Sequence, residues 1–160
     1  MLQIYLRSLF IFVFCFLLMS KSHAQGQKFA FLEGMGSGVL VNANFDMRFK
    51  SESREGLGFK AGIGYSGLYM DEQLLTIPIG VNYLLGKNRS GLLLGVNALI
   101  SASSDHYNGE LKSFVPSLEL GYRFRPIEKG FAFQVTYNPL FNTVDGFKPL
   151  WFGVGLGYAW

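Results

Sequence analysis

The closing stretch LWFGVGLGYAW (150–160) decides the fold class. Its odd positions hold Trp151 and then only glycine and alanine. Its even positions are all large and apolar: Leu150, Phe152, Val154, Leu156, Tyr158 and Trp160. A period of two residues is typical of a β-strand, in which successive side chains point to opposite faces. The stretch therefore predicts a strand with one bulky apolar face and one nearly bare face.

The same alternation recurs along the chain before this stretch. An earlier segment, Phe29–Gly36, alternates less cleanly and leaves the direction of Glu33 open. The segments that alternate cleanly are 41–50, 59–66, 75–83, 92–101, 114–125 and 131–138. Together these segments predict eight strands of about nine to twelve residues, which is long enough to cross a bilayer when the strands are tilted.

The polarity of the two faces predicts which one points outward. The face opposite the large apolar residues carries many glycines and the charged residues Asp46, Arg48, Lys60, Glu119 and Arg123. A soluble barrel turns its apolar face inward, but about forty bulky side chains would not fit inside eight strands, whereas glycines and small polar residues do. We therefore expect an all-β chain that forms an eight-stranded antiparallel transmembrane β-barrel of up-and-down topology, with its apolar face toward lipid.

The connections between strands predict the orientation. The compact ones are 51–56, 86–91 and 125–130, the longer ones are 66–73, 101–112 and 142–148, and Ser37-Gly38 is a tight exception. Bacterial barrels have short periplasmic turns and longer outer loops. The compact connections and the N-terminus are thus expected on the periplasmic side. Aromatic residues at the same strand ends, such as Tyr122, Phe131 and Tyr158, predict a girdle at that membrane surface.

Residues 1–24 differ in kind from the rest. Arg7 lies in a short basic start, Leu9–Met19 is an unbroken apolar run, and Ser22-His23-Ala24 places small residues at a cleavage site. This layout is typical of a secretory signal peptide, and the apolar run is far shorter than the roughly twenty residues of a spanning helix. We expect a signal peptide over 1–24 and the barrel over 25–160.

Charge and cysteine content exclude some classes of protein. The single cysteine, Cys15, lies in the expected signal, so disulfides do not stabilise the mature chain. Removal of Arg7 and Lys21 with the signal leaves twelve basic residues against eleven acidic ones. A net charge of +1 argues against a nucleic-acid partner. No pattern in the sequence points to a cofactor or a metal.

Three stretches carry a resemblance to known proteins: IPIGVNYLLGK (77–87), PSLELGYRFRPIEKGFAFQVTYNPLF (116–141) and FGVGLGYAW (152–160). They resemble a family of small bacterial outer-membrane β-barrel proteins, most of them uncharacterised. The resemblance implies a location in the cell outer membrane, with the lipids of that membrane as partners. Leu156, Tyr158 and Trp160 look like the C-terminal signal that the barrel-assembly machinery recognises, with Trp where Phe is commoner. The family supplies no catalytic residues.

The inward charges allow a functional and a structural interpretation. Asp46 with Arg48 and Lys60, and Glu119 with Arg123 and Arg125, can form opposite-charge contacts. A gated ion path or a polar-ligand site is the functional alternative. We favour a structural plug of ion pairs, because buried charges need partners and eight strands leave no continuous water channel.

Two further patterns bear on catalysis. His106 lies near Ser103, Ser104, Asp105 and Glu110, and some small outer-membrane barrels are lipid-modifying hydrolases or acyltransferases that use a serine and a histidine. The same residue types make up ordinary solvated loops. The glycines at 153, 155 and 157 lack the following helix and acidic residue of a dinucleotide site.

The sequence therefore favours a non-enzymatic outer-membrane barrel, with a structural role or an unidentified partner for its outer loops. A lipid-modifying enzyme that uses His106 is the alternative, and a narrow pore comes third.

Overall fold

The computed structural model describes residues 28–38, 40–50, 53–65, 74–105, 109–143 and 146–160. The expected signal peptide lies outside these residues. The strands are β1 (Lys28–Met35), β2 (Val41–Arg48), β3 (Gly56–Tyr65), β4 (Leu74–Leu85), β5 (Ser90–Asp105), β6 (Gly109–Phe124), β7 (Gly130–Tyr137), β8 (Leu140–Thr143), β9 (Gly146–Lys148) and β10 (Phe152–Ala159). The described part of the chain contains no helix long and apolar enough to cross a membrane.

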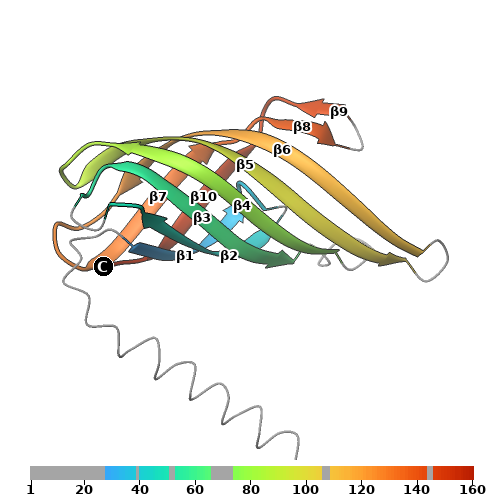
Figure 1. Ribbon diagram of the computed structural model, residues 1–160, viewed down its shortest axis with the longest axis horizontal. Coiled ribbons are helices and arrows are strands. Elements are labelled where there is room, and N and C mark those ends of the chain that lie inside the picture. The colour runs from blue at the N-terminus through green and yellow to red at the C-terminus, as the bar shows by residue number, and fades with distance from the viewer. Residues whose placement is uncertain (1–27, 39, 51–52, 66–73, 106–108, 144–145) are drawn as a thin grey trace, which may run out of the picture.

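Eight of these strands close into an antiparallel barrel, as the sequence predicted (Figure 1). Each barrel strand pairs with its neighbour along the chain, apart from β10, which pairs with β7 and with β1. The pairing of β10 with β1 joins the last strand to the first, so the wall has no unpaired edge. The β2–β3, β4–β5 and β6–β7 connections meet at one end, which we call the compact-turn end. We call the opposite end the long-hairpin end.

The long-hairpin end differs from the expectation in two connections. The stretch 101–112 was expected to be a loop, but β5 and β6 stay paired through it as far as Asp105 and Gly109. The stretch 142–148 contains most of a small hairpin, β8–β9, which branches from β6 where Ser117 pairs with Leu140. Both additions are polar or irregular in sequence. Backbone pairing does not require an apolar face. The alternation of hydrophobic residues therefore underestimates the length of strands that extend beyond the apolar part of the outer wall.

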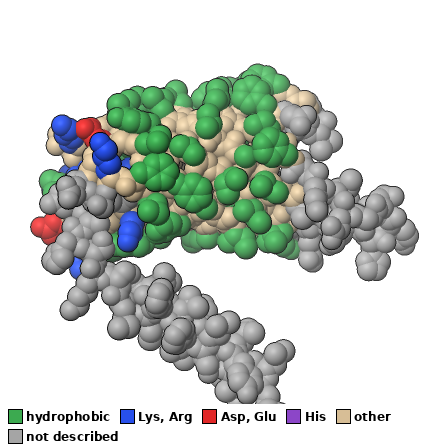
Figure 2. Space-filling view, in the orientation of Figure 1, with side chains coloured by type: hydrophobic (Ala, Val, Ile, Leu, Met, Phe, Trp, Pro, Cys, Tyr) green, Lys and Arg blue, Asp and Glu red, His purple; other side chains and the backbone are tan. Residues whose placement is uncertain are grey.

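Exposure alternates along the wall as expected. On β6, Leu118 is 49% exposed and the adjacent Glu119 only 2%. Figure 2 shows hydrophobic side chains spread over the outer wall between the two ends. The apolar face therefore points away from the lumen and the polar face into it, which is the reverse of a soluble barrel.

The first strand departs most from this pattern, although Leu84, Leu93 and Leu99 are also buried. Phe29 and Phe31 point into the lumen, where their rings stack 4.4 Å apart. The neighbouring strand β10 approaches β1 very closely at this point, since a Cβ atom added to Gly157 would lie 2.0 Å from the Ala30 carbonyl oxygen. At Gly155 such an atom would lie 2.8 Å from the Phe31 ring. The bare face of β10 thus makes room for the two phenylalanines, which explains the alternating glycines.

Candidate functional site

The candidate site is the polar interior of the barrel. It contains all five charged residues that the sequence placed on the inner face: Asp46, Arg48, Lys60, Glu119 and Arg123. They come from β2, β3 and β6, and none is more than 3% exposed. Alternation puts them inside, because each occupies a position whose two neighbours face outward.

Asp46 is the centre of one cluster. Arg123 binds its carboxylate with two nitrogens, Nη1 to Oδ1 at 2.9 Å and Nη2 to Oδ2 at 3.1 Å. Arg48 donates to Asp46 Oδ1 and to the Asn82 side-chain oxygen. The Asn82 amide in turn donates to Asp46 Oδ2 at 2.7 Å. The carboxylate is therefore held by two guanidinium groups and an amide, and paired guanidinium–carboxylate bonds are among the strongest in proteins.

A second ion pair joins Lys60 Nζ to Glu119 Oε1 at 2.5 Å, and both side chains are fully buried. These partners differ from those expected. The sequence grouped Lys60 with Asp46 and Glu119 with Arg123, whereas the structure bonds Lys60 to Glu119 and Arg123 to Asp46. Alternation shows only that a side chain points inward. The partner across the lumen depends on the stagger of the strands and on barrel closure.

Glu33 belongs to the same interior, and the sequence left it open. Its carboxylate is fully buried and accepts hydrogen bonds from neutral groups of three elements. Asn42 donates at 2.9 Å, Asn44 at 3.1 Å and Gln134 at 3.3 Å, and the Ser37 hydroxyl donates at 2.9 Å. The inward phenylalanines of β1 obscured the pattern that would have placed Glu33. The sequence did contain one indication that a carboxylate lies inside, namely the repeated inward amides Asn42 and Asn44 on β2 and Gln134 on β7.

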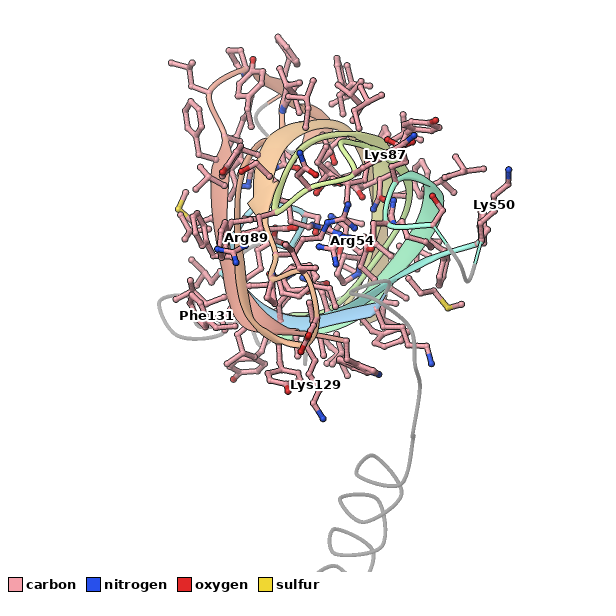
Figure 3. All side chains as sticks on the ribbon, turned by 90° about the vertical axis from the view of Figure 1, so that its left-hand side faces the viewer. Lys50, Arg54, Lys87, Arg89, Lys129 and Phe131 are labelled. Carbon is pink, nitrogen blue, oxygen red and sulfur yellow. The ribbon has the colours of Figure 1, made fainter. Side chains whose placement is uncertain are left out.

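Two arginines close the compact-turn end, and Arg54 lies at the centre of that mouth in Figure 3. From the β2–β3 connection it donates to Lys87 O at 3.2 Å, to Pro126 O at 2.6 Å and to Ile127 O. It thereby ties together all three compact connections. Arg125 donates to Gly86 O at 2.8 Å. Burial and the neighbouring Arg54 lower the pKa of Arg125 to about 9, which leaves the group charged at neutral pH.

The interior toward the long-hairpin end is polar but less completely bonded. Side-chain atoms of Asn42, Thr76, Asn97 and Asn138 are buried without a hydrogen-bond partner in the described part of the chain. Asn97 lacks partners for both its oxygen and its nitrogen. Buried polar groups of this kind are normally satisfied by ordered water.

The remaining predicted residues lie elsewhere. Leu156 and Tyr158 point outward on β10, and the Trp160 backbone pairs with Lys28 on β1. His106 lies outside the described residues. Ser104 pairs through its backbone with Glu110. Among the residues that the structure places, no three His, Cys, Asp or Glu side chains form a group that could hold a metal.

We compared the chain with protein-family models, curated proteins and solved structures. No protein-family model matches the chain. No curated protein matches it either, and no solved structure does so. Function therefore has to follow from the barrel itself.

Proposed function

We propose that this chain is an integral protein of the bacterial outer membrane, with a non-enzymatic role as a structural barrel or through a partner bound at its long-hairpin end. One observation carries the proposal: the barrel has an apolar outer wall and a charged, hydrogen-bonded interior. Water would solvate such a protein poorly, since large exposed apolar surfaces are rare on soluble proteins. A bilayer suits it, because a closed wall leaves no backbone group unpaired in lipid.

The interior supports a structural rather than a catalytic role. Each of its carboxylates accepts hydrogen bonds from other interior groups: Asp46 from two arginines, Glu119 Oε1 from Lys60, and Glu33 from amides and a hydroxyl. A catalytic acid or base needs access to a substrate in a positioned geometry. Groups that bond to one another inside a narrow wall instead cross-link the strands.

The expected orientation follows from the same topology. The compact-turn end, with both ends of the barrel segment, would face the periplasm, and the long-hairpin end would face outward. The cleaved signal over 1–24, the barrel-assembly signal at Leu156, Tyr158 and Trp160, and the resemblance to small outer-membrane barrels all agree with this location. They remain expectations on which the proposal draws.

Membrane insertion can be tested on the outward face of β10. Val154 is 51% exposed near the middle of the strand, and Val154→Arg should disfavour insertion by about 2–4 kcal/mol, the cost of a charge near the bilayer midplane in such barrels. Cell fractionation should find the wild type in the outer membrane as a heat-modifiable band on a gel. The variant should lose most of that band.

Leu150→Arg is the matched control. Leu150 is 77% exposed and precedes β10 at the long-hairpin end, where an arginine can reach water. It should fold nearly as well as the wild type. Equal folding of both arginine variants, or a wild type found in the soluble periplasm, would refute the membrane assignment.

A further inference from the structure

Exposed cations surround the compact-turn end. We call this set the basic rim; it consists of Lys28, Lys50, Lys87, Arg89 and Lys129. All are exposed except Lys28, which is half-buried. Figure 3 looks onto this end, and Lys50, Lys87 and Lys129 extend away from the barrel on different sides. These three rim cations therefore point outward, in contrast to Arg54 at the centre of the mouth.

The basic rim is weakly neutralised by the protein. The Lys87 Nζ atom lies 3.7 Å from Glu55 Oε1, but the Lys87 side chain is 82% exposed. The attraction between exposed charges of this kind is weak. Lys50, Arg89 and Lys129 form no ion pair with any residue that the structure describes. Most of the rim charge thus remains available to an external partner.

Each side of the rim adjoins the apolar outer wall. Phe49, next to Lys50, is 57% exposed, and Phe131, two residues after Lys129, is 60% exposed. The Tyr122 hydroxyl lies 2.6 Å from that of Ser90, which follows Arg89. Figure 2 shows the charged side chains at the same end as the edge of this apolar surface. Aromatic rings beside long cationic side chains are typical of the boundary between hydrocarbon and headgroups.

The charge of the barrel segment is distributed unequally between its ends. The compact-turn end carries seven cations, namely the basic rim with Arg54 and Arg125, and its connections contain in sequence Glu52, Glu55 and Glu128, a net charge of +4. The connections at the long-hairpin end, including the β8–β9 hairpin, carry in sequence five acids against Lys112 and Lys148, a net charge of −3. A partner with negative charge is therefore favoured at one end only.

We propose that the basic rim binds the phosphate groups of anionic phospholipids in the leaflet that surrounds the compact-turn end. This inference rests on the proposed membrane location. The cations lie on different sides of the barrel, so they would contact a ring of headgroups rather than one bound lipid. Their stems would lie along the apolar wall while their charges reach the phosphates. The rim would thereby help to set the depth and orientation of the barrel.

The chain offers a reporter at each end. It has two tryptophans, and Trp160 lies at the compact-turn end, where its backbone pairs with Lys28. Trp151 lies at the other end, where it donates to Gly36 O. Trp151→Phe thus leaves a reporter at the basic rim, and Trp160→Phe leaves one at the opposite end. The purified protein is folded into phosphatidylcholine vesicles that contain a fixed fraction of brominated phosphatidylglycerol or brominated phosphatidylcholine, and quenching of fluorescence is compared.

We expect brominated phosphatidylglycerol to be enriched about twofold or more over brominated phosphatidylcholine around Trp160, since each cation near an anionic surface attracts it appreciably. Trp151 should show no such preference. High salt should weaken the enrichment at Trp160 by screening. Lys50→Gln with Lys129→Gln should reduce the enrichment strongly, because both lysines adjoin strands that border Trp160. Lys129 precedes Gly130, which pairs with Ala159. Lys50 follows β2, and the ring centroids of Phe45 on β2 and of Trp160 lie 6.1 Å apart.

Lys112→Gln with Lys148→Gln removes the same number of charges from the long-hairpin end and should leave the enrichment unchanged. Equal quenching of Trp160 by the two brominated lipids would overturn the rim proposal while leaving membrane insertion intact. An enrichment that survives the removal of Lys50 and Lys129 would overturn the rim proposal in the same way. A folded, heat-modifiable protein that neither lipid quenches would overturn membrane insertion, and the rim proposal with it.

Discussion

The two halves of the lumen use similar polar side chains but bond them differently. Toward the compact turns, Asn82 donates to Asp46 and accepts from Arg48, so both ends of its amide are used. Toward the long hairpin, Asn97 is also buried, yet neither end of its amide has a partner in the described part of the chain. The same residue type on adjacent strands thus cross-links the barrel in one half and makes no side-chain hydrogen bond to the described residues in the other.

This difference shows where the interior contributes stability. In the compact-turn half, the Asp46 cluster joins strands far apart in sequence, since Arg123 follows Asp46 by 77 residues. In the other half, away from the Glu33 carboxylate and its donors, β4 and β5 contribute neutral buried side chains: Thr76, Asn97, Leu99 and Ser101. A Cβ atom at Gly80 would lie 2.0 Å from the Asn97 oxygen. We expect the loss of a polar side chain to be costly in the first half and mild at positions of the second half, such as Asn97, that have no hydrogen-bond partner among the described residues.

The largest effect is expected at Asp46. Asp46→Ala would leave Arg48 and Arg123 buried without their shared carboxylate, and removing one partner of a buried ion pair costs about 3–5 kcal/mol. We expect a loss at the upper end of that range, about 5 kcal/mol. The measurement is the free energy of unfolding in detergent, followed by tryptophan fluorescence during guanidinium titration. Asp46→Asn, which keeps the shape and one acceptor oxygen, should lose less.

Glu119→Ala tests the second ion pair, with a smaller expected effect of about 3 kcal/mol. The loss should arise from the stranded Lys60 rather than from Arg123, whose carboxylate partner is Asp46. A double variant, Glu119→Ala with Lys60→Met, should therefore recover part of the stability. If Glu119→Ala with Arg123→Met recovered more in the same titration, the assigned pairing would be wrong.

The two asparagines provide the direct test of the comparison. Asn82→Ala removes hydrogen bonds to charged groups and should destabilise the barrel by about 2 kcal/mol. Asn97→Ala removes an amide that has no partner among the described residues and should change the free energy of unfolding by less than about 0.5 kcal/mol. Equal losses in the two variants would show that the two halves of the lumen do not differ in this way.

The smallest expected signal is electrical. In planar bilayers the purified barrel should carry no stable large conductance, because eight strands enclose only enough room for side chains. Arg54 further blocks the compact-turn mouth through its bonds to Lys87, Pro126 and Ile127. A steady porin-like current would contradict the closure of the compact-turn mouth and would favour transport as the function.

Local periodicity accounts for most of what the sequence predicted correctly. Segments such as 150–160 indicate a strand and its two faces without reference to the rest of the chain. Periodicity was insufficient in β1, where Phe29 and Phe31 face inward and only the glycines of β10 make this possible. It also missed β8–β9 and the extension of β5 and β6, because strands outside the apolar belt need no alternation of hydrophobicity.

The sequence by itself determined the eight barrel strands, their inward and outward faces, and the presence of charged residues inside. These properties depend on a repeat of two residues, which can be read one strand at a time. Only the tertiary structure decided which charges meet, that Glu33 joins them, and that Arg54 closes one mouth. Those contacts join residues as far apart as Glu33 and Gln134, 101 positions apart, and they depend on strand stagger and on the closure of β10 against β1.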